Sequence, residues 1–114
     1  MSTKQFNFRN KLSQVMNLAW QFVRKLGFSM SEALKVAWMN IKLREQMKNR
    51  IVKFHFQKID GSVREAYGTL VSTMLPPTKG TGKPGNPLIQ TYYDTEREQY
   101  RCFKKANLLD FVSL

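Results

Sequence analysis

The sequence is poor in the residues that build disulfides, metal sites and nucleophilic catalytic sites. Its single cysteine, Cys102, excludes an internal disulfide, so we expect a reducing compartment. Its single histidine, His55, leaves too few ligands for a structural zinc site, which needs about four. A nucleophile also needs a positioned base and an orienting group. The sequence therefore predicts a non-enzymatic protein with no catalytic residues, no metal and no cofactor.

Long apolar stretches are also missing. Residues 1–10 are polar and basic and lack the apolar core of about 7 to 15 residues that a signal peptide requires. No segment approaches the roughly 20 apolar residues of a membrane span. We therefore expect no membrane partner and a cytoplasmic location, or packaging in a particle assembled inside a cell.

Acidic residues are scarce, and their scarcity makes the chain strongly basic. Eight acidic residues face 19 basic ones, which gives a net charge of +11. The excess is largest at residues 1–50, where ten basic residues accompany two acidic ones. Such a charge attracts polyanions at long range. The 42% apolar content is typical of a folded domain, and 114 residues suit one compact unit.

Two amphipathic helices are expected in the first fifty residues. Apolar residues spaced by three and four predict a helix over 12–26, which Gly27 ends. Ser29 and Glu32 have the spacing of a capping box and predict the start of a second helix that stops near Asn49. The first apolar stripe is Leu12, Val15, Met16, Ala19, Phe22, Val23 and Leu26, and the second is Leu34, Ala37, Trp38, Ile41 and Met47.

The apolar period then changes from 3.6 to 2. Val52, Phe54 and Phe56 alternate with polar residues, which predicts a half-buried strand. The pair Asp60-Gly61 favours a type I′ hairpin turn into a second strand over 63–73.

A proline- and glycine-rich segment, 76–87, follows and predicts a long loop. Three further short strands are expected over 88–93, 99–104 and 110–114. Between them, Asp94, Glu96 and Glu98 share a charged turn, and we interpret them as solvated. The fold class is therefore α+β: a basic N-terminal helical hairpin over 1–50 and a small five-stranded antiparallel barrel over 51–114.

The strand residues carry a resemblance to a known family. The run Val52–Thr69, with Tyr92–Asp94 and Arg101–Lys104, resembles the WYL-like family of Sm-like, SH3-type β-barrels. The resemblance covers about residues 51–112. Such domains occur in Bacteroides-group bacteria and their crAss-like phages, which implies a bacterial host cell or a virion-associated protein. The Trp-Tyr-Leu triplet that names the larger family is absent.

The resemblance implies an SH3/Sm-like barrel that binds negatively charged ligands, such as nucleotides or nucleic acid. The ligand would lie in a groove lined by basic residues and by a position often taken by cysteine. In this chain the groove residues would be Lys58, Arg64, Arg101 and Lys104, with Cys102 at the cysteine position.

Basic and aromatic residues interleave along the predicted strands. Basic side chains can follow a phosphate backbone while aromatic faces stack on unpaired bases, so the pattern favours single-stranded nucleic acid. The alternative is that the tyrosines pack in the sheet and the lysines only solubilise it. The candidate anion-binding residues are Lys53, Lys58, Arg64, Arg101, Lys104 and Lys105, and the candidate base-stacking residues are Tyr67 and Tyr92.

The helical hairpin supports a second hypothesis. Trp20 and Trp38 are candidate partner-docking residues, so the chain could be a phage or bacterial protein-interaction or assembly module, or a homo-oligomer. Two helices joined by a short turn also resemble a helix-turn-helix, but that motif normally needs a third supporting helix, and none is expected before the strands.

Overall fold

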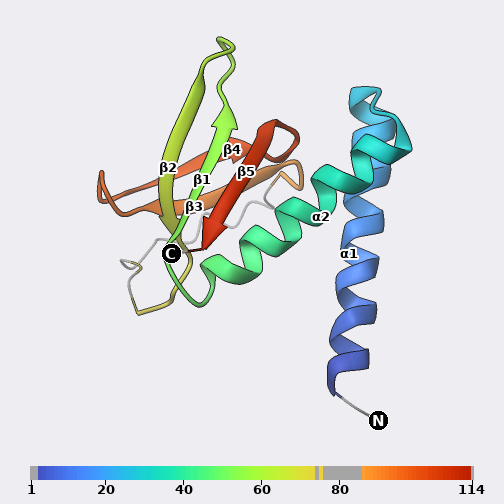
Figure 1. The fold of residues 1–114 in the computed structure, drawn as a ribbon, viewed down its shortest axis with the longest axis horizontal. Helices are drawn as coiled ribbons and strands as arrows, with labels where there is room; N and C mark the ends of the chain where they lie inside the picture. The colour runs from blue at the N-terminus through green and yellow to red at the C-terminus, as the bar shows by residue number, and fades with distance from the viewer. Residues whose placement is uncertain (1–2, 74, 76–85, 114) are drawn as a thin grey trace.

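The computed structural model describes residues 3–73, 75 and 86–113, and its elements follow the predicted order of two helices and five strands (Figure 1). The helices are α1 (Thr3–Leu26) and α2 (Met30–Met47). The strands are β1 (Val52–Gln57), β2 (Val63–Thr69), β3 (Ile89–Asp94), β4 (Gln99–Lys104) and β5 (Leu108–Ser113), with a 3₁₀ turn η1 (Lys105–Asn107) between the last two. The predicted α+β fold class is confirmed.

The two helices form a hairpin through the predicted end and start signals. Gly27 adopts a φ of 74°, which suits a residue without a Cβ, and its N–H donates to the Val23 carbonyl at 3.2 Å. Ser29 caps α2, because its Oγ accepts the Glu32 N–H at 3.2 Å. The buried interface between the helices consists of Val15, Leu18, Ala19, Phe22, Ala33, Ala37 and Ile41. The first predicted stripe is only partly buried, since Leu12, Met16 and Leu26 remain exposed.

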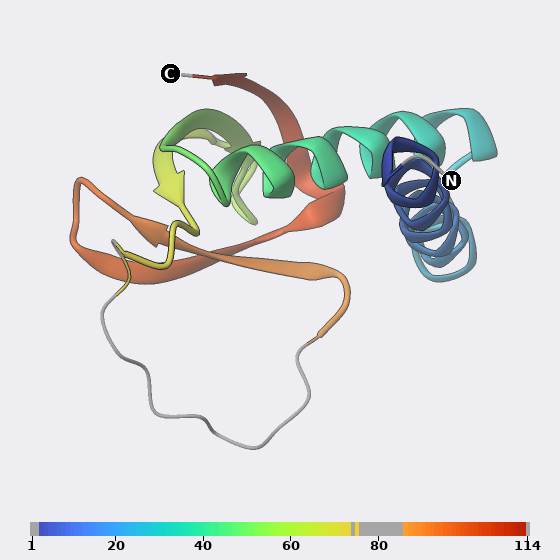
Figure 2. The same ribbon diagram turned by 90° about the horizontal axis from the view of Figure 1, so that it is seen from below.

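The five strands form one antiparallel sheet in the order β4-β3-β2-β1-β5. The sheet bends sharply, so that β3 and β4 run across the other three strands (Figures 1 and 2). Strands β2 and β3 pair only where Gly68 and Thr69 meet Asp94 and Tyr93. The short turn η1 joins β4 and β5, the two edges of the sheet.

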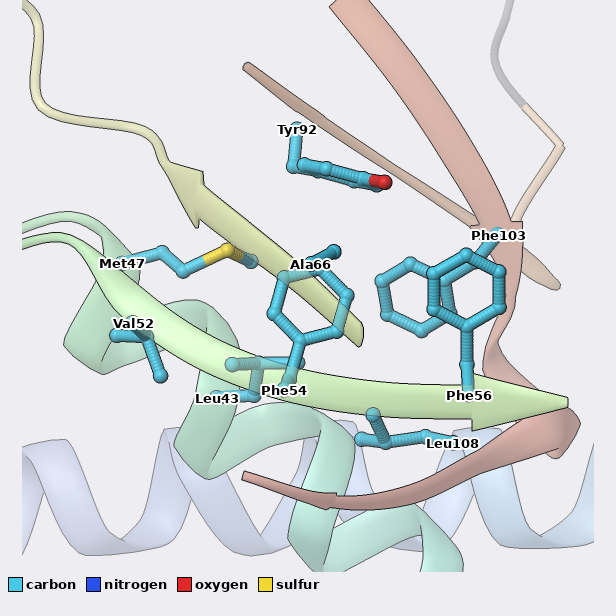
Figure 3. Packing of buried hydrophobic residues seen from close by; sticks show 9 residues of the cluster. All are labelled: Leu43, Met47, Val52, Phe54, Phe56, Ala66, Tyr92, Phe103 and Leu108. Carbon is cyan, nitrogen blue, oxygen red and sulfur yellow. The ribbon is translucent and has the colours of Figure 1, made fainter. Parts of the chain in front are cut away.

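Aromatic rings fill the inside of the bent sheet (Figure 3). The ring of Phe54 contacts Tyr92 edge to face at a centroid distance of 5.0 Å and Phe103 at 5.2 Å. Phe56 stacks on Phe103 at 5.3 Å. The alternation of Val52, Phe54 and Phe56 predicted this buried face correctly.

Helix α2 contributes to both hydrophobic clusters. Its first half packs on α1, whereas Leu43 and Met47 are fully buried in the cluster that fills the barrel. The predicted division at residue 50 stays a prediction, and α2 physically links the parts on either side of it.

Four local predictions were wrong. The first helix begins at Thr3 rather than at residue 12, and the last strand begins at Leu108 rather than at residue 110. A type I′ turn needs positive φ at both Asp60 and Gly61, but only Gly61 has it, at 91°. The turn is wider: the Lys58 N–H donates to the Ser62 carbonyl at 2.7 Å, and the Asp60 carboxylate accepts the Ser62 N–H at 2.9 Å. Strand β2 also ends at Thr69 rather than at residue 73. Just after this end, the Thr69 Oγ1 accepts the Val71 N–H at 3.1 Å.

Most of the predicted loop over 76–87 lies outside the described residues, because the description resumes at residue 86. Among the helices that are described, none has the length and apolar character needed to cross a membrane.

Candidate functional site

Three of the predicted groove residues line one hollow, which we call the basic groove. It has a volume of about 570 Å³ and lies between the β1–β2 turn and the end of β4. Strand alternation turns Phe103 inward and leaves Cys102 and Lys104 exposed, while Lys58 follows the end of β1. The lining residues are Phe56, Gln57, Lys58, Ile59, Asp60, Ile89, Cys102, Phe103, Lys104 and Asn107.

The basic groove combines an apolar floor with two cations. Phe56, Phe103 and Ile89 supply apolar surface, and Ile59 at the turn is 88% exposed. Neither Lys58 nor Lys104 has a carboxylate oxygen within 4.0 Å among the residues described. Both ammonium groups are therefore available to an anionic ligand.

The groove extends towards the helical hairpin. A second hollow of about 630 Å³ shares Lys58, Ile59 and Lys104 with the first and reaches Leu26 and Phe28 at the turn between the helices. The two hollows therefore share part of their lining, on the side of the barrel that faces the helical hairpin.

Arg64 and Arg101 form a separate cluster around a buried carboxylate. They lie 3.9 Å and 3.8 Å from the Asp94 Oδ2, respectively. Asp94 is 3% exposed, and its Oδ1 also accepts the N–H groups of Glu96 and Arg97, so it shapes the β3–β4 turn. The interpretation of Asp94 as a solvated charge was wrong, because pairing with Gly68 turns its side chain towards the inside of the sheet.

Tyr92 was wrongly predicted to stack on bases. Its side chain is completely buried against Phe54 and Phe103, so neither face of the ring can reach a ligand. Burial, followed by the charge of Asp94, raises the Tyr92 pKa to about 12. Its hydroxyl has no hydrogen-bond partner within the described part of the chain.

Lys53 and Tyr67 lie on the outer face of the sheet, and both side chains interact with the carboxylate of Glu65. The Tyr67 hydroxyl donates to the Glu65 Oε1 at 2.9 Å, and the Lys53 Nζ lies 3.5 Å from that oxygen. The Tyr67 hydrogen bond is the main cause that lowers the Glu65 pKa, and the Lys53 charge adds to it. His55 extends this network, with its Nδ1 2.6 Å from the Asp110 Oδ1.

Lys105 lies in η1, where its surroundings disfavour a charged amine. Burial lowers the Lys105 pKa, and the nearby Arg44 charge lowers it further. The Lys105 carbonyl accepts the Asn40 Nδ2–H at 2.8 Å, which ties α2 to the barrel. We therefore expect Lys105 to contribute to the packing of α2 on the barrel more than to a phosphate contact.

The two tryptophans differ in exposure. Trp20 on α1 is 43% exposed, and the Arg24 guanidinium lies 5.5 Å from its ring centroid. Trp38 on α2 is half-buried at the edge of the helix–helix interface, and the Lys42 Nζ lies 5.9 Å from its centroid.

Sequence reasoning missed Ile59 and Asp94 as parts of these sites. The position of Ile59 beside the predicted Asp60-Gly61 turn was an available signal, because turns lie on the protein surface. No comparable local signal marked Asp94, since its neighbours Glu96 and Glu98 are exposed.

The bent five-stranded sheet with a 3₁₀ turn before its last strand places the chain among the Sm-like, SH3-type β-barrels. The family model of WYL_2, described as an Sm-like SH3 β-barrel fold, matches residues 40–109. This match covers more than half of the chain, which therefore belongs to the WYL_2 family. The matched region begins within α2 and includes Leu43 and Met47. No curated protein and no solved structure matched the chain.

Membership confirms the family and fold that the strand residues predicted. The Bacteroides-group or crAss-like phage origin stays a prediction. No metal-binding group of three or more histidine, cysteine or acidic side chains occurs in residues 3–73, 75 and 86–113.

Proposed function

We propose that the protein is a non-enzymatic barrel that binds nucleic acid, preferably single-stranded, through the basic groove. The observation that supports this most directly is the pair of lysines, Lys58 and Lys104, at the rim of an apolar hollow. Lysines bind phosphates, and an apolar floor accepts the faces of unpaired bases.

The remaining charges support the same ligand class. The net charge of +11 attracts a polyanion from a distance. Arg64 and Arg101 share one carboxylate, Asp94, so this cluster keeps a net positive charge. A single nucleotide is the smaller ligand of the same chemistry, but the extension of the groove towards Phe28 favours a strand.

Fluorescence anisotropy tests the proposal with labelled single-stranded DNA, single-stranded RNA and duplex DNA at low and near-physiological salt. We expect single strands to bind most tightly and the affinity to fall steeply with salt. The double variant Lys58→Glu/Lys104→Glu should weaken binding about tenfold or more and reduce the salt dependence, because each lost phosphate contact removes about 0.7 from the log–log slope.

The matched control for each single lysine variant is Arg9→Glu. It changes the net charge by the same amount as Lys58→Glu, but Arg9 lies near the start of α1 and lines neither hollow. Equal losses in Arg9→Glu and Lys58→Glu would mean that only net charge matters. Unchanged binding by the double variant would refute the groove.

A protein-docking function is the second candidate, and one surface favours it. Leu12, Met16 and Trp20 are spaced by four residues on α1, and all three are at least 36% exposed. Such a stripe suits a helix that docks in a partner groove or on a second copy. Sedimentation velocity would detect a salt-resistant oligomer that Trp20→Ser disrupts. A monomer at every salt concentration would remove self-association.

A further inference from the structure

A third hollow lies on the helical element, apart from the basic groove. It has a volume of about 540 Å³ and is lined by Lys35, Trp38, Met39, Lys42 and Phe111, none of which lines the basic groove. Helical spacing places Lys35 about one turn before Trp38 and Lys42 about one turn after it. Strand β5 supplies Phe111.

The hollow presents an aromatic surface with a cation at each end. The Lys42 Nζ lies 5.9 Å from the Trp38 ring centroid. Lys35 and Lys42 are both exposed, and the described side chains place no carboxylate oxygen within 4.0 Å of either. Met39 and Phe111 widen the apolar surface beside the indole.

We propose that this hollow is a second nucleic-acid subsite, in which one base stacks on Trp38 while Lys35 and Lys42 bind phosphates on either side of it. This inference rests on the proposed function, because it assigns a further contact to the same strand. It also gives the helical element a role in binding, in place of the partner-docking role predicted for Trp38.

The spacing of the two lysines favours a strand over a single nucleotide. Lys42 follows Lys35 by seven positions in the helix, a rise of about 10 Å along the axis. With both side chains extended along the helix, each ammonium group can meet its own phosphate, and a base within a strand has a phosphate on each side. An acidic peptide would satisfy the lysines but would make no use of the indole face.

Lys42 can exchange partners when a base enters. A cation–π contact at an exposed site is weak, whereas base stacking on an aromatic side chain is stronger. An incoming base can therefore take the place of the ammonium over Trp38, and the ammonium can turn to a phosphate. The hollow is thus compatible with both the free and the bound arrangement.

The two tryptophans allow a direct test in the full-length chain. Trp20→Phe leaves Trp38 as the only tryptophan, and Trp38→Phe leaves Trp20. Stacking quenches indole fluorescence, so a deoxythymidine oligonucleotide should quench the Trp20→Phe protein strongly and the Trp38→Phe protein little. An abasic oligonucleotide of equal length should bind with little quenching in either.

Affinity measurements give an independent readout. Trp38→Leu should weaken oligonucleotide binding between about 5-fold and 150-fold, the range that corresponds to loss of one stacked base, and Trp38→Phe should restore part of it. Lys35→Glu and Lys42→Glu should each lower the salt slope, whereas Arg9→Glu is the matched charge control. Far-UV circular dichroism shows whether Trp38→Leu remains folded. The variants Lys35→Glu and Lys42→Glu test the site without changing the packed side chain of Trp38.

The outcomes separate this inference from the proposed function. If the wild type binds no oligonucleotide, the proposed function fails. If binding depends on Lys58 and Lys104 but Trp38 is not quenched and its variants bind normally, only the second subsite is refuted. Equal quenching by the abasic strand, or by polyglutamate, would also refute base stacking at Trp38.

Discussion

Replacement of Gly68 by alanine tests how tightly the inside of the barrel is packed. Gly68 lies in β2, opposite Val52 in β1 and Asp94 in β3. A Cβ atom at this position would lie 2.6 Å from the Tyr92 Cδ2 and 2.9 Å from the Phe54 Cε1. Both distances are shorter than real Cβ contacts, so at least one ring must move.

Neither ring can move cheaply. Tyr92 and Phe54 are completely buried and pack edge to face, and Phe103 contacts both. Overpacking of such a core costs about 1 to 3 kcal/mol. Alanine recovers up to about 1 kcal/mol through the lower backbone entropy of the unfolded chain. We therefore expect Gly68→Ala to lower the free energy of unfolding by about 1 to 2 kcal/mol.

Urea unfolding followed by far-UV circular dichroism measures this change. The midpoint should fall while the slope stays constant, because the surface exposed on unfolding is nearly the same. Phe54→Leu removes the ring edge that the new Cβ meets, so the double variant Gly68→Ala/Phe54→Leu should lose less stability than the two single losses combined. A Gly68→Ala protein as stable as the wild type, or a strictly additive double variant, would refute the packing argument.

Two further predictions concern buried polar groups. Tyr92→Phe removes a buried hydroxyl without a partner among the described residues, so it should leave stability unchanged or raise it by up to about 1 kcal/mol in the same urea assay. In the folded protein the Tyr92 pKa is raised from 10.0 to about 12, so the unfolded chain loses this proton first as the pH rises. The free energy of unfolding of the wild type should therefore fall between about pH 10 and about pH 12, and that of Tyr92→Phe should fall less. Asn40→Ala removes the donor to the Lys105 carbonyl together with a buried Oδ1 that has no partner among the described residues, so it should cost about 0.5 to 1.5 kcal/mol, and a normal midpoint would contradict this role.

Local signals in the sequence predicted local structure well. Gly27 and Ser29 ended and started helices where their backbone and side-chain chemistry required. The alternation of Val52, Phe54 and Phe56 identified both a strand and its buried face, because polar residues separate them. The Asp60-Gly61 pair located a turn but not its type, since the side chain of Asp60 stabilises a wider loop.

Alternation in the sequence could not show which face of β3 is buried. Tyr92 and Tyr93 are adjacent and chemically identical, so alternation alone does not tell which one is buried. The pairing of Gly68 with Asp94 and Thr69 with Tyr93 decides it, and that pairing joins segments far apart in the sequence. The burial of Asp94 follows from the same register.

Part of the candidate site could be predicted from the sequence because of the family resemblance. Lys58, Cys102 and Lys104 were named through the family resemblance, and the structure places all three around one hollow. The hollow on α2 required the fold, because Phe111 joins Trp38 only when β5 packs beside the helix. Periodicity placed Trp38 in an apolar stripe but could not show which part of its ring stays accessible.

The distribution of acidic partners separates the basic residues into two groups with different effects on binding. Arg64 and Arg101 share the buried carboxylate of Asp94, so an anion approaching them meets a charge that is already partly compensated. Lys58 and Lys104 have no carboxylate oxygen within 4.0 Å among the described residues, so they can bind a phosphate without breaking a close ion pair. Asp60 lies beside Lys58 in the same groove, where the Ser62 hydrogen bonds and then the Lys58 charge lower its pKa. Because separating an existing pair costs free energy, we expect the two lysines to contribute more affinity to the proposed groove than the two arginines.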